Sequence, residues 1–235
     1  MPEDELTTHA LLATGEIEIE MRMPYSSNAT FLVRISDGAQ TRRAIYKPLQ
    51  GERPLWDFPP GLHRREVAAY RLAEFMGFHF VPLTILRDGP LGEGSVQLLV
   101  EADFEQHYFT LFEARPELHE HFRNMAIFDI VANNTDRKSG HVLIDASSHI
   151  WGIDHGLCFS ADFKLRTVIW EFGGEEISPG ALQAVERVAS ALPLDVSTLL
   201  HDDEVTALNE RAGWLLEHRQ FPVDESGRRY PWPLV

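Results

Sequence analysis

The spacing of hydrophobic residues changes part-way along this chain. Residues 16–23 read Glu-Ile-Glu-Ile-Glu-Met-Arg-Met, a strict alternation that is typical of a strand with one buried face. In the second half, apolar residues such as Leu118, Phe122 and Met125 recur three or four positions apart, which is the period of a helix. A β-rich part followed by a helical part predicts an α+β fold, with the join near residues 101–105.

The first part is expected to form an antiparallel sheet with one helix. Pro, Ser and Asn residues at 24–29 suit a tight connection, so the first two strands should pair as a hairpin. Further on, Asp88-Gly89-Pro90 and Gly92-Glu93-Gly94 are typical of turns. The predicted strands cover residues 16–23, 30–35, 44–48, 80–86 and 95–100, and the predicted helix covers residues 62–78.

The second part is expected to be mainly helical around one short hairpin. A helix should end near residues 132–134, and strands over 142–145 and 150–154 should flank the turn Ala146-Ser147-Ser148. Two later segments, 179–192 and 204–217, carry helical periodicity, and the tail over 222–235 should be irregular. We therefore divide the chain into an N-terminal lobe, residues 1–104, and a C-terminal lobe, residues 105–235.

Charge and cysteine usage restrict the environment and the partners. The 21 Lys and Arg residues against 36 Asp and Glu residues give a net charge of −15, which disfavours nucleic acid and anionic lipid surfaces. Neither a nucleic-acid partner nor stable membrane association is expected. Cys158 is a single cysteine, so an intrachain disulfide is impossible and a reducing compartment fits. With an acidic N-terminus and no apolar run near the length of a membrane span, a cytoplasmic location is expected.

Four residues occur in the order that phosphoryl transfer requires. This chemistry needs a cation on the nucleotide phosphates, a carboxylate near the attacking hydroxyl and ligands for a metal ion. Lys47 ends the third strand, and Glu66 lies on or beside the apolar face of the following helix, where a carboxylate needs a cationic partner. Asp136 lies on the loop Asn-Thr-Asp-Arg, and Asp154 follows eighteen residues later in Asp-His-Gly. Each signal is weak alone, but the ordered set is strong.

The two loops also resemble those of a known family. Residues 128–137 (Phe-Asp-Ile-Val-Ala-Asn-Asn-Thr-Asp-Arg), 142–144 (Val-Leu-Ile) and 152–156 (Gly-Ile-Asp-His-Gly) are similar to the catalytic and metal loops of type II phosphatidylinositol 4-kinases. These belong to a kinase-like group that includes phosphatidylinositol 3- and 4-kinases and HipA-type kinases, and the layout resembles an uncharacterised, mainly actinobacterial branch. The resemblance extends over about residues 15–220 and implies one domain with a two-lobed, protein-kinase-like fold.

The resemblance implies ATP and a divalent metal ion, Mg²⁺ or Mn²⁺, as cofactors. Lys47, paired with Glu66, would hold the phosphates, Asp136 would orient or deprotonate the acceptor, and Asp154 would bind the metal, while Asp129 and Asn134 would brace the loop. By position, residues 97–101 would form the hinge that meets adenine, and residues 26–29 would lie over the phosphates. The nucleotide-binding candidates are thus Lys47, Ser26, Ser27, Asn28, Gln97, Glu101 and Asn134.

The chain departs from the family pattern in two places. A glycine-rich phosphate loop is missing, and Ser26, Ser27 and Asn28 are expected to supply hydroxyl, amide and backbone donors instead. His141 stands five residues after Asp136, where the family has a metal-binding Asn. Imidazole is a poor ligand for Mg²⁺ and a better one for Mn²⁺, so either the metal differs or His141 only forms hydrogen bonds.

Several functions remain open on this basis. The first is an ATP-dependent phosphotransferase that acts on a soluble acceptor, either a protein or a small molecule. The alternatives are a nucleotide-binding pseudokinase, which His141 favours, and an enzyme of the same fold that transfers the nucleotidyl group. A lipid kinase is disfavoured because the chain has no polybasic stretch. A metal hydrolase built on His119, His121, His141 and His155 is also disfavoured, because no His-Glu-Xaa-Xaa-His spacing occurs.

Overall fold

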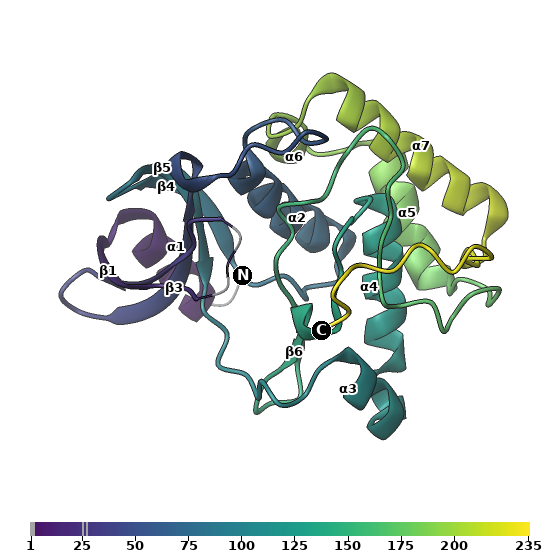
Figure 1. The fold of residues 1–235 in the computed structure, drawn as a ribbon, viewed down its shortest axis with the longest axis horizontal. Coiled ribbons are helices and arrows are strands. Elements are labelled where there is room, and N and C mark those ends of the chain that lie inside the picture. Colours follow the sequence, from purple (N-terminus) through teal and green to yellow (C-terminus); the bar gives the residue numbers. More distant parts are fainter. Residues whose placement is uncertain (1–2, 25, 27) are drawn as a thin grey trace.

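Five antiparallel strands form one sheet in the first part of the chain (Figure 1), in the spatial order β1-β2-β3-β5-β4. The computed structural model describes residues 3–24, 26 and 28–235. The strands are β1 (Glu16–Arg22), β2 (Phe31–Ser36), β3 (Thr41–Pro48), β4 (Thr84–Gly89) and β5 (Gly92–Leu98). Each pairs with its neighbours in antiparallel register, and the predicted hairpin between the first two strands is confirmed.

The sheet buries one face beneath an N-terminal helix, α1 (Glu3–Thr14). Leu11 and Leu12 of α1 form a small core with Val33 and Ile35 of β2 and with further residues of β3 to β5. This helix was not predicted, because its few apolar residues form no clear helical stripe in the sequence. It supplies the apolar surface that the period-2 pattern of the strands requires on one side.

The predicted turn at Gly92-Glu93-Gly94 is wrong, because these residues begin β5. Gly89 pairs with Gly92, so only Pro90 and Leu91 connect the two strands. Gly94 is a strand residue with a packing role: a Cβ there would lie 2.6 Å from the Tyr46 ring and 2.6 Å from the Lys47 carbonyl oxygen. Here glycine permits close approach of β3 rather than a turn. The strand predicted over 80–86 likewise begins only at Thr84.

Helix α2 (Leu62–Met76) lies between the sheet and the helical part. Its face with Ala69, Leu72, Ala73 and Met76 is buried in the larger core of the molecule, as the helical periodicity predicted. The helix ends at Gly77, whose φ of 76° is the left-handed conformation that glycine adopts readily at a C-cap. Glu66 is therefore held on a rigid element whose orientation is set by packing on both parts of the chain.

The second part is mainly helical, which confirms the α+β class. The predicted hairpin and the three predicted helices are present, whereas α3 and α6 were not expected. The helices are α3 (Tyr108–Ala114), α4 (His119–Val131), α5 (Pro179–Ser190), α6 (Leu194–Ser197) and α7 (Asp202–His218), and the strands are β6 (Val142–Ile144) and β7 (Ile150–Gly152). Short 3₁₀ turns occur at Leu49–Gly51, Pro116–Leu118 and Ser139–His141.

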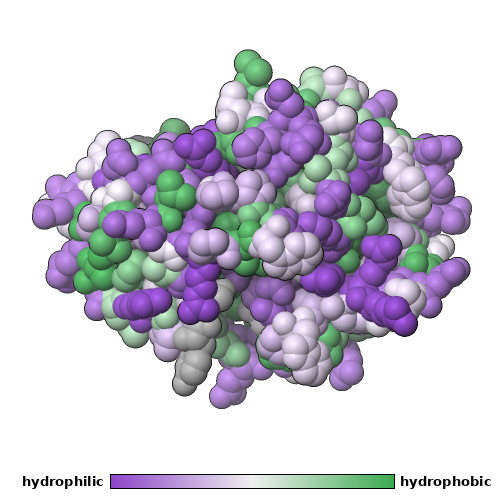
Figure 2. All heavy atoms as spheres, turned by 45° about the horizontal axis from the view of Figure 1, so that its top comes forward, coloured by the Kyte–Doolittle hydropathy of each residue, from purple (hydrophilic) through white to green (hydrophobic). Residues whose placement is uncertain are grey.

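The C-terminal tail is irregular, as predicted, and returns to the middle of the molecule near β6 (Figure 1). The backbone N–H of Ser139 donates to the Leu234 carbonyl at 2.7 Å, which anchors the tail beside the 139–141 turn. Figure 2 shows a face covered mainly by hydrophilic residues, with hydrophobic residues in small patches between them. Across residues 3–24, 26 and 28–235, no helix has the length and apolar character that a membrane crossing needs.

Candidate functional site

Three of the predicted residues meet at one point between the two parts of the chain. Lys47, near the end of β3, forms ion pairs with Glu66 of α2 and with Asp154, which follows β7. The Lys47 Nζ to Asp154 Oδ1 distance is 2.7 Å. The ion pair predicted between Lys47 and Glu66 is therefore present, and the structure adds Asp154 as a second carboxylate on the same ammonium group.

The electrostatics of this cluster favour its charged forms. Desolvation alone would lower the pKa of Lys47, but the carboxylates of Asp154 and Glu66 outweigh it and raise the pKa above its ordinary value. The ammonium group of Lys47 in turn lowers the pKa of Asp154. At neutral pH Lys47 is thus a cation and Asp154 a carboxylate; the Asp154 side chain is half exposed, whereas the Glu66 side chain is buried.

The Asp-His-Gly segment is shaped to approach Glu66. Asp154 has φ of 62°, a left-handed conformation that is uncommon for residues other than Gly, Asn and Asp. The backbone N–H of His155 donates to Glu66 Oε2 at 3.0 Å. A Cβ at Gly156 would lie only 3.2 Å from Glu66 Oε1, so glycine suits the close approach. Glu66 therefore binds Lys47 through one oxygen and positions the Asp154 loop through the other.

Asp136 lies on a loop whose conformation is set by Asn134. The Asn134 side chain donates to Asp129 Oδ1 at 2.9 Å, and its own Oδ1 accepts from the backbone N–H of Asp136 at 3.0 Å. The only charged partner of Asp136 in the described residues is Lys138, at 2.9 Å. Burial raises the pKa of Asp136 above its ordinary value, which favours a carboxylate that can accept a proton. Asn134 is fully buried, so both polar groups of its side chain serve the loop.

A buried arginine joins the two loops. Arg137 and Asp129 have side chains that are 0% exposed, and the guanidinium binds both carboxylate oxygens. Arg137 Nη1 also donates to the Ile153 carbonyl at 3.2 Å, and Nη2 donates to His155 Nε2 at 2.7 Å. One side chain thus connects the Asp136 loop with the residues on either side of Asp154. The sequence motif contained Arg137, but no role had been predicted for it.

Two adjoining cavities lie beside this cluster. An apolar cavity of about 320 Å³ lies between the sheet and the β6–β7 hairpin. Its lining includes Ser26, Ile45, Lys47, Gln97, Leu98, Leu99, Val100, Phe104, His141, Leu143, Ile153 and Asp154. A polar cavity of about 480 Å³ continues past Lys47; its lining includes Ser26, Asn28, Lys47, Arg53, Glu66, Asp136, Lys138, His141 and Asp154. Lys47, His141 and Asp154 border both cavities.

The remaining nucleotide-binding candidates lie in different places. Gln97 borders the apolar cavity, but its side-chain amide donates to Thr84 Oγ1 at 2.9 Å and is buried. Glu101 lines neither cavity; it borders an adjacent hollow of about 700 Å³ with Arg43 and Arg115. Ser27 lies outside the described residues. The hinge and loop assignments therefore rest on position, with Ser26 and Asn28 at the cavity walls.

His141 lies next to Asp154, with His141 Nε2 3.5 Å from Asp154 Oδ2. Burial lowers the pKa of His141 to about 4, so its imidazole is neutral at pH 7, and its Nδ1 accepts a hydrogen bond from the backbone N–H of Lys138 at 3.4 Å. In the part of the chain that the structure describes, no group of three or more His, Cys, Asp or Glu side chains is arranged to hold a metal ion. Asp154 supplies a carboxylate oxygen, the kind of ligand that Mg²⁺ and Mn²⁺ bind together with phosphate oxygens and water, whereas the His141 imidazole suits Mn²⁺ better than Mg²⁺.

Two pairings near the site were not predicted. Arg65 of α2 is buried, forms an ion pair with Glu204 of α7, and donates through Nε to the Cys158 carbonyl at 3.1 Å. These contacts tie the helix that carries Glu66 to the helical part. The ion pair between Lys138 and Asp136 was also not predicted, although the position of Lys138, two residues after Asp136, could have indicated it. No signal could have indicated Arg65 and Glu204, which are 139 residues apart.

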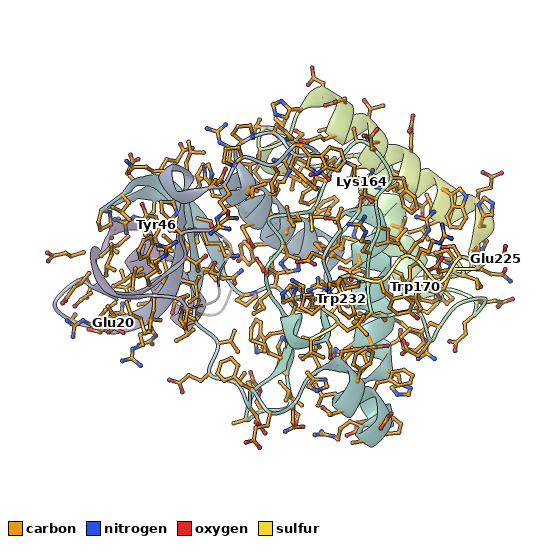
Figure 3. All side chains as sticks on the ribbon, in the orientation of Figure 1. Glu20, Tyr46, Lys164, Trp170, Glu225 and Trp232 are labelled. Carbon is orange, nitrogen blue, oxygen red and sulfur yellow. The ribbon has the colours of Figure 1, made fainter. Side chains whose placement is uncertain are left out.

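Figure 3 shows how the two parts contribute side chains: Glu20 and Tyr46 lie in the sheet, whereas Lys164, Trp170 and Trp232 lie in the helical part. Lys164 also reaches across to the loop before α2, donating to the Asp57 carbonyl at 3.1 Å. The two cavities themselves are lined by residues of both parts, such as Lys47 and Asp154.

Comparison with solved structures identifies this fold as kinase-like and two-lobed. The Helicobacter pylori proinflammatory kinase CtkA superposes with a TM-score of 0.55 at 12% identity, covering 89% of this chain and 94% of that chain. The Golgi casein kinase superposes with a TM-score of 0.59 at 14% identity, covering 94% of this chain and 80% of that chain. At these identities the likeness concerns the fold alone.

Sequence comparison finds a relative with much higher identity to this chain. No known protein-family model matches the chain. Protein Rv2133c of Mycobacterium tuberculosis is 37% identical over 262 residues, with 96% of this chain and 94% of the relative covered. Identity of this level over nearly the whole length of both proteins means that the chain belongs to the family of the mycobacterial protein Rv2133c.

Proposed function

We propose that this protein is an ATP-dependent phosphotransferase. The observation that carries the proposal is the meeting of Lys47, Glu66 and Asp154 at the boundary of an apolar and a polar cavity, with Asp136 on the wall of the polar one. An apolar slot next to a cation and carboxylates suits a nucleotide, whose base is flat and whose phosphates are charged.

Each residue has a role in this reaction. The adenine occupies the apolar cavity, and the phosphates extend past Lys47, whose ammonium group holds them. Asp154, with His141 beside it, would hold a metal ion, which would neutralise phosphate charge. Asp136 accepts the proton of the acceptor hydroxyl as that oxygen bonds to the terminal phosphorus, and the bond to the bridging oxygen breaks to release ADP. Lys138 stabilises the charge on the transferred group.

The family resemblance supports a finer placement. The two loops and the mycobacterial relative are consistent with an actinobacterial branch of the group that includes phosphatidylinositol 3- and 4-kinases and HipA-type kinases. Within it, residues 1–104 act as the N-terminal lobe and residues 105–235 as the C-terminal lobe. The acceptor is a protein or small molecule in solution rather than a lipid, because a net charge of −15 opposes docking on an anionic surface.

Analysis of the products from ATP tests this proposal against its alternatives. Phosphoryl transfer releases ADP, nucleotidyl transfer releases pyrophosphate, and a pseudokinase releases neither. The pseudokinase is the second candidate, because His141 stands where the related kinases carry a metal-binding Asn. If ATP bound but no product formed with any of many acceptors, even at a large molar excess of ATP over the protein, the pseudokinase would be favoured over the phosphotransferase.

The nucleotide site predicts a metal-dependent thermal stabilisation. A ligand at one hundred times its dissociation constant stabilises the folded state by about 2.7 kcal/mol. For a chain of this size, this corresponds to a rise in Tm of roughly 5–10 °C. We expect this rise with ATP plus Mg²⁺ or Mn²⁺ in the wild type, and its loss in Asp154→Ala. Asp162→Ala is the matched control, because the Asp162 side chain is 87% exposed and lies outside both cavities. No rise in the wild type would contradict the nucleotide site.

The position of His141 predicts a change in metal preference. Asparagine offers an oxygen ligand, so His141→Asn should raise the ratio of Mg²⁺-supported to Mn²⁺-supported ADP release severalfold. The ratio is measured at matched concentrations of the two ions. His79→Asn is the control, because His79 is exposed, pairs with Glu74 and has φ of 49°, which asparagine tolerates. An unchanged ratio in His141→Asn would mean that His141 is not a ligand.

A further inference from the structure

A cavity of about 430 Å³ lies in the helical part, separate from the two cavities of the candidate active site. Its walls include Ile130 of α4, Phe163 of the segment after β7, Trp214 of α7 and Pro222 of the tail. Phe163 is 51% exposed and Trp214 is 41% exposed. The volume is within the range of small-molecule sites, and the walls are largely apolar.

Arg211 of α7 also lines this cavity and is only 8% exposed. Its Nε donates to the Val131 carbonyl at 2.9 Å, and its Nη1 donates to the Ser160 carbonyl at 3.4 Å. Its Nη2 is buried and has no hydrogen-bond partner among the described residues. A buried guanidinium nitrogen that lacks an acceptor is costly, so Nη2 has free energy to gain from a ligand.

The charges around Arg211 leave room for an anion. Glu210 borders the cavity, yet the structure contains no ion pair between its carboxylate and Arg211. Glu204, the other nearby carboxylate, is already paired with Arg65. Burial lowers the pKa of Arg211 to about 10, although the negative charges of Glu210 and Glu204 oppose part of this shift. Arg211 is still protonated at neutral pH.

We propose that this cavity binds a small carboxylic acid with an apolar body, such as an aryl or short fatty acid. The carboxylate accepts hydrogen bonds from the Arg211 guanidinium, a charge-assisted pairing that is stronger than one between neutral groups. The apolar body lies against Ile130, Phe163 and Trp214. Since Nη2 is shielded from solvent, binding includes a local shift of the cavity wall that gives the carboxylate access to it.

The ligand would contact a segment that is tied to the Asp136 loop. The Ser160 carbonyl accepts from Arg211 and also from the Asn133 side chain, at 2.8 Å. Asn133 holds two more groups of this segment: its Nδ2 donates to the Asp162 carbonyl at 2.7 Å, and its Oδ1 accepts from the backbone N–H of Lys164 at 3.0 Å. The inference itself concerns binding and does not depend on the proposed phosphotransferase activity.

Binding of 4-phenylbutyrate and of its uncharged amide, 4-phenylbutyramide, to the full chain tests the proposal. Trp214 lines the cavity, so intrinsic fluorescence and calorimetry both report occupancy. We expect the acid to bind the wild type about tenfold to one-hundredfold more tightly than the amide, the range for a hydrogen bond to a charged group. Equal affinities, or no binding of either compound, would overturn the proposal and leave Arg211 as a bridge between α7 and two carbonyl groups.

Two variants separate the site from the fold. Arg211→Met should remove the preference for the acid over the amide. Because Arg211→Met also loses the hydrogen bonds to the Val131 and Ser160 carbonyls, a second variant, Ala207→Met, is needed. The larger side chain fills the cavity, and Arg211 with its hydrogen bonds is kept. Ala207→Met should abolish binding of both compounds while the ATP-dependent rise in Tm remains. Retained binding in Ala207→Met would place the ligand elsewhere and contradict the proposal.

Discussion

Replacing Asp136 with alanine is expected to abolish phosphoryl transfer while nucleotide affinity stays nearly unchanged. A general base contributes about 10²- to 10⁴-fold to the rate of such reactions, so ADP release should fall by a factor in this range. Asp136 contacts Lys138, and its backbone N–H is held by Asn134, whose other bonds do not involve the Asp136 side chain. The loop should therefore keep its conformation in the variant.

Comparison of Asp136→Ala with Asp154→Ala provides the measurement. Both should lose ADP release, but only Asp154→Ala should also lose the metal-dependent rise in Tm with ATP. Asp162→Ala, on an exposed side chain, should keep both properties. If Asp136→Ala lost nucleotide binding as completely as Asp154→Ala, Asp136 would be part of the nucleotide or metal site, and its proposed role toward the acceptor would be wrong.

The largest loss of stability is expected for Arg137→Met. The variant leaves the Asp129 carboxylate, which is 0% exposed, without its cation. Breaking a buried ion pair by removing one partner costs about 3–5 kcal/mol, because the remaining charge stays buried. Arg137 also binds the Ile153 carbonyl and His155, so the loss should lie toward the upper end of this range.

Urea unfolding of the variant and the wild type measures this effect. Removing both charges in Asp129→Leu/Arg137→Met should be less destabilising than Arg137→Met alone, because no uncompensated carboxylate remains. Arg34→Met is the matched control: Arg34 pairs with Glu18 on the surface of the sheet, where both side chains are exposed, and its loss should change the midpoint little. A midpoint for Arg137→Met equal to that of Arg34→Met would mean that the buried pair contributes no stability.

The elements of this fold could be predicted wherever one face is buried and the other is not. In residues 16–22 the apolar residues alternate with polar ones, and in α2, α5 and α7 they recur at helical spacing, so the sequence itself shows which face is the more buried. These elements were confirmed. Prediction failed where tertiary packing overrides local preference. Gly92 and Gly94 have turn-forming composition, but both pair with neighbouring strands, and the absence of a Cβ at Gly94 leaves room for the Tyr46 ring.

The candidate site divides in the same way. By itself the sequence placed Lys47 at the end of a strand and Asp136 and Asp154 on loops. The order and spacing of these three residues indicated a phosphate and metal site. Their mutual contacts, and the two cavities between the sheet and the β6–β7 hairpin, were decided by the tertiary structure.

Several partners were likewise decided only by packing. Glu66 contacts both Lys47 and the His155 backbone, Arg65 meets Glu204, and Arg211 lies in the wall of a separate cavity with one donor unpaired. Local periodicity records whether a side chain faces the core but not which distant group it meets there. That pairing depends on the relative orientation of whole helices and strands, which is set by the shape of the complete core.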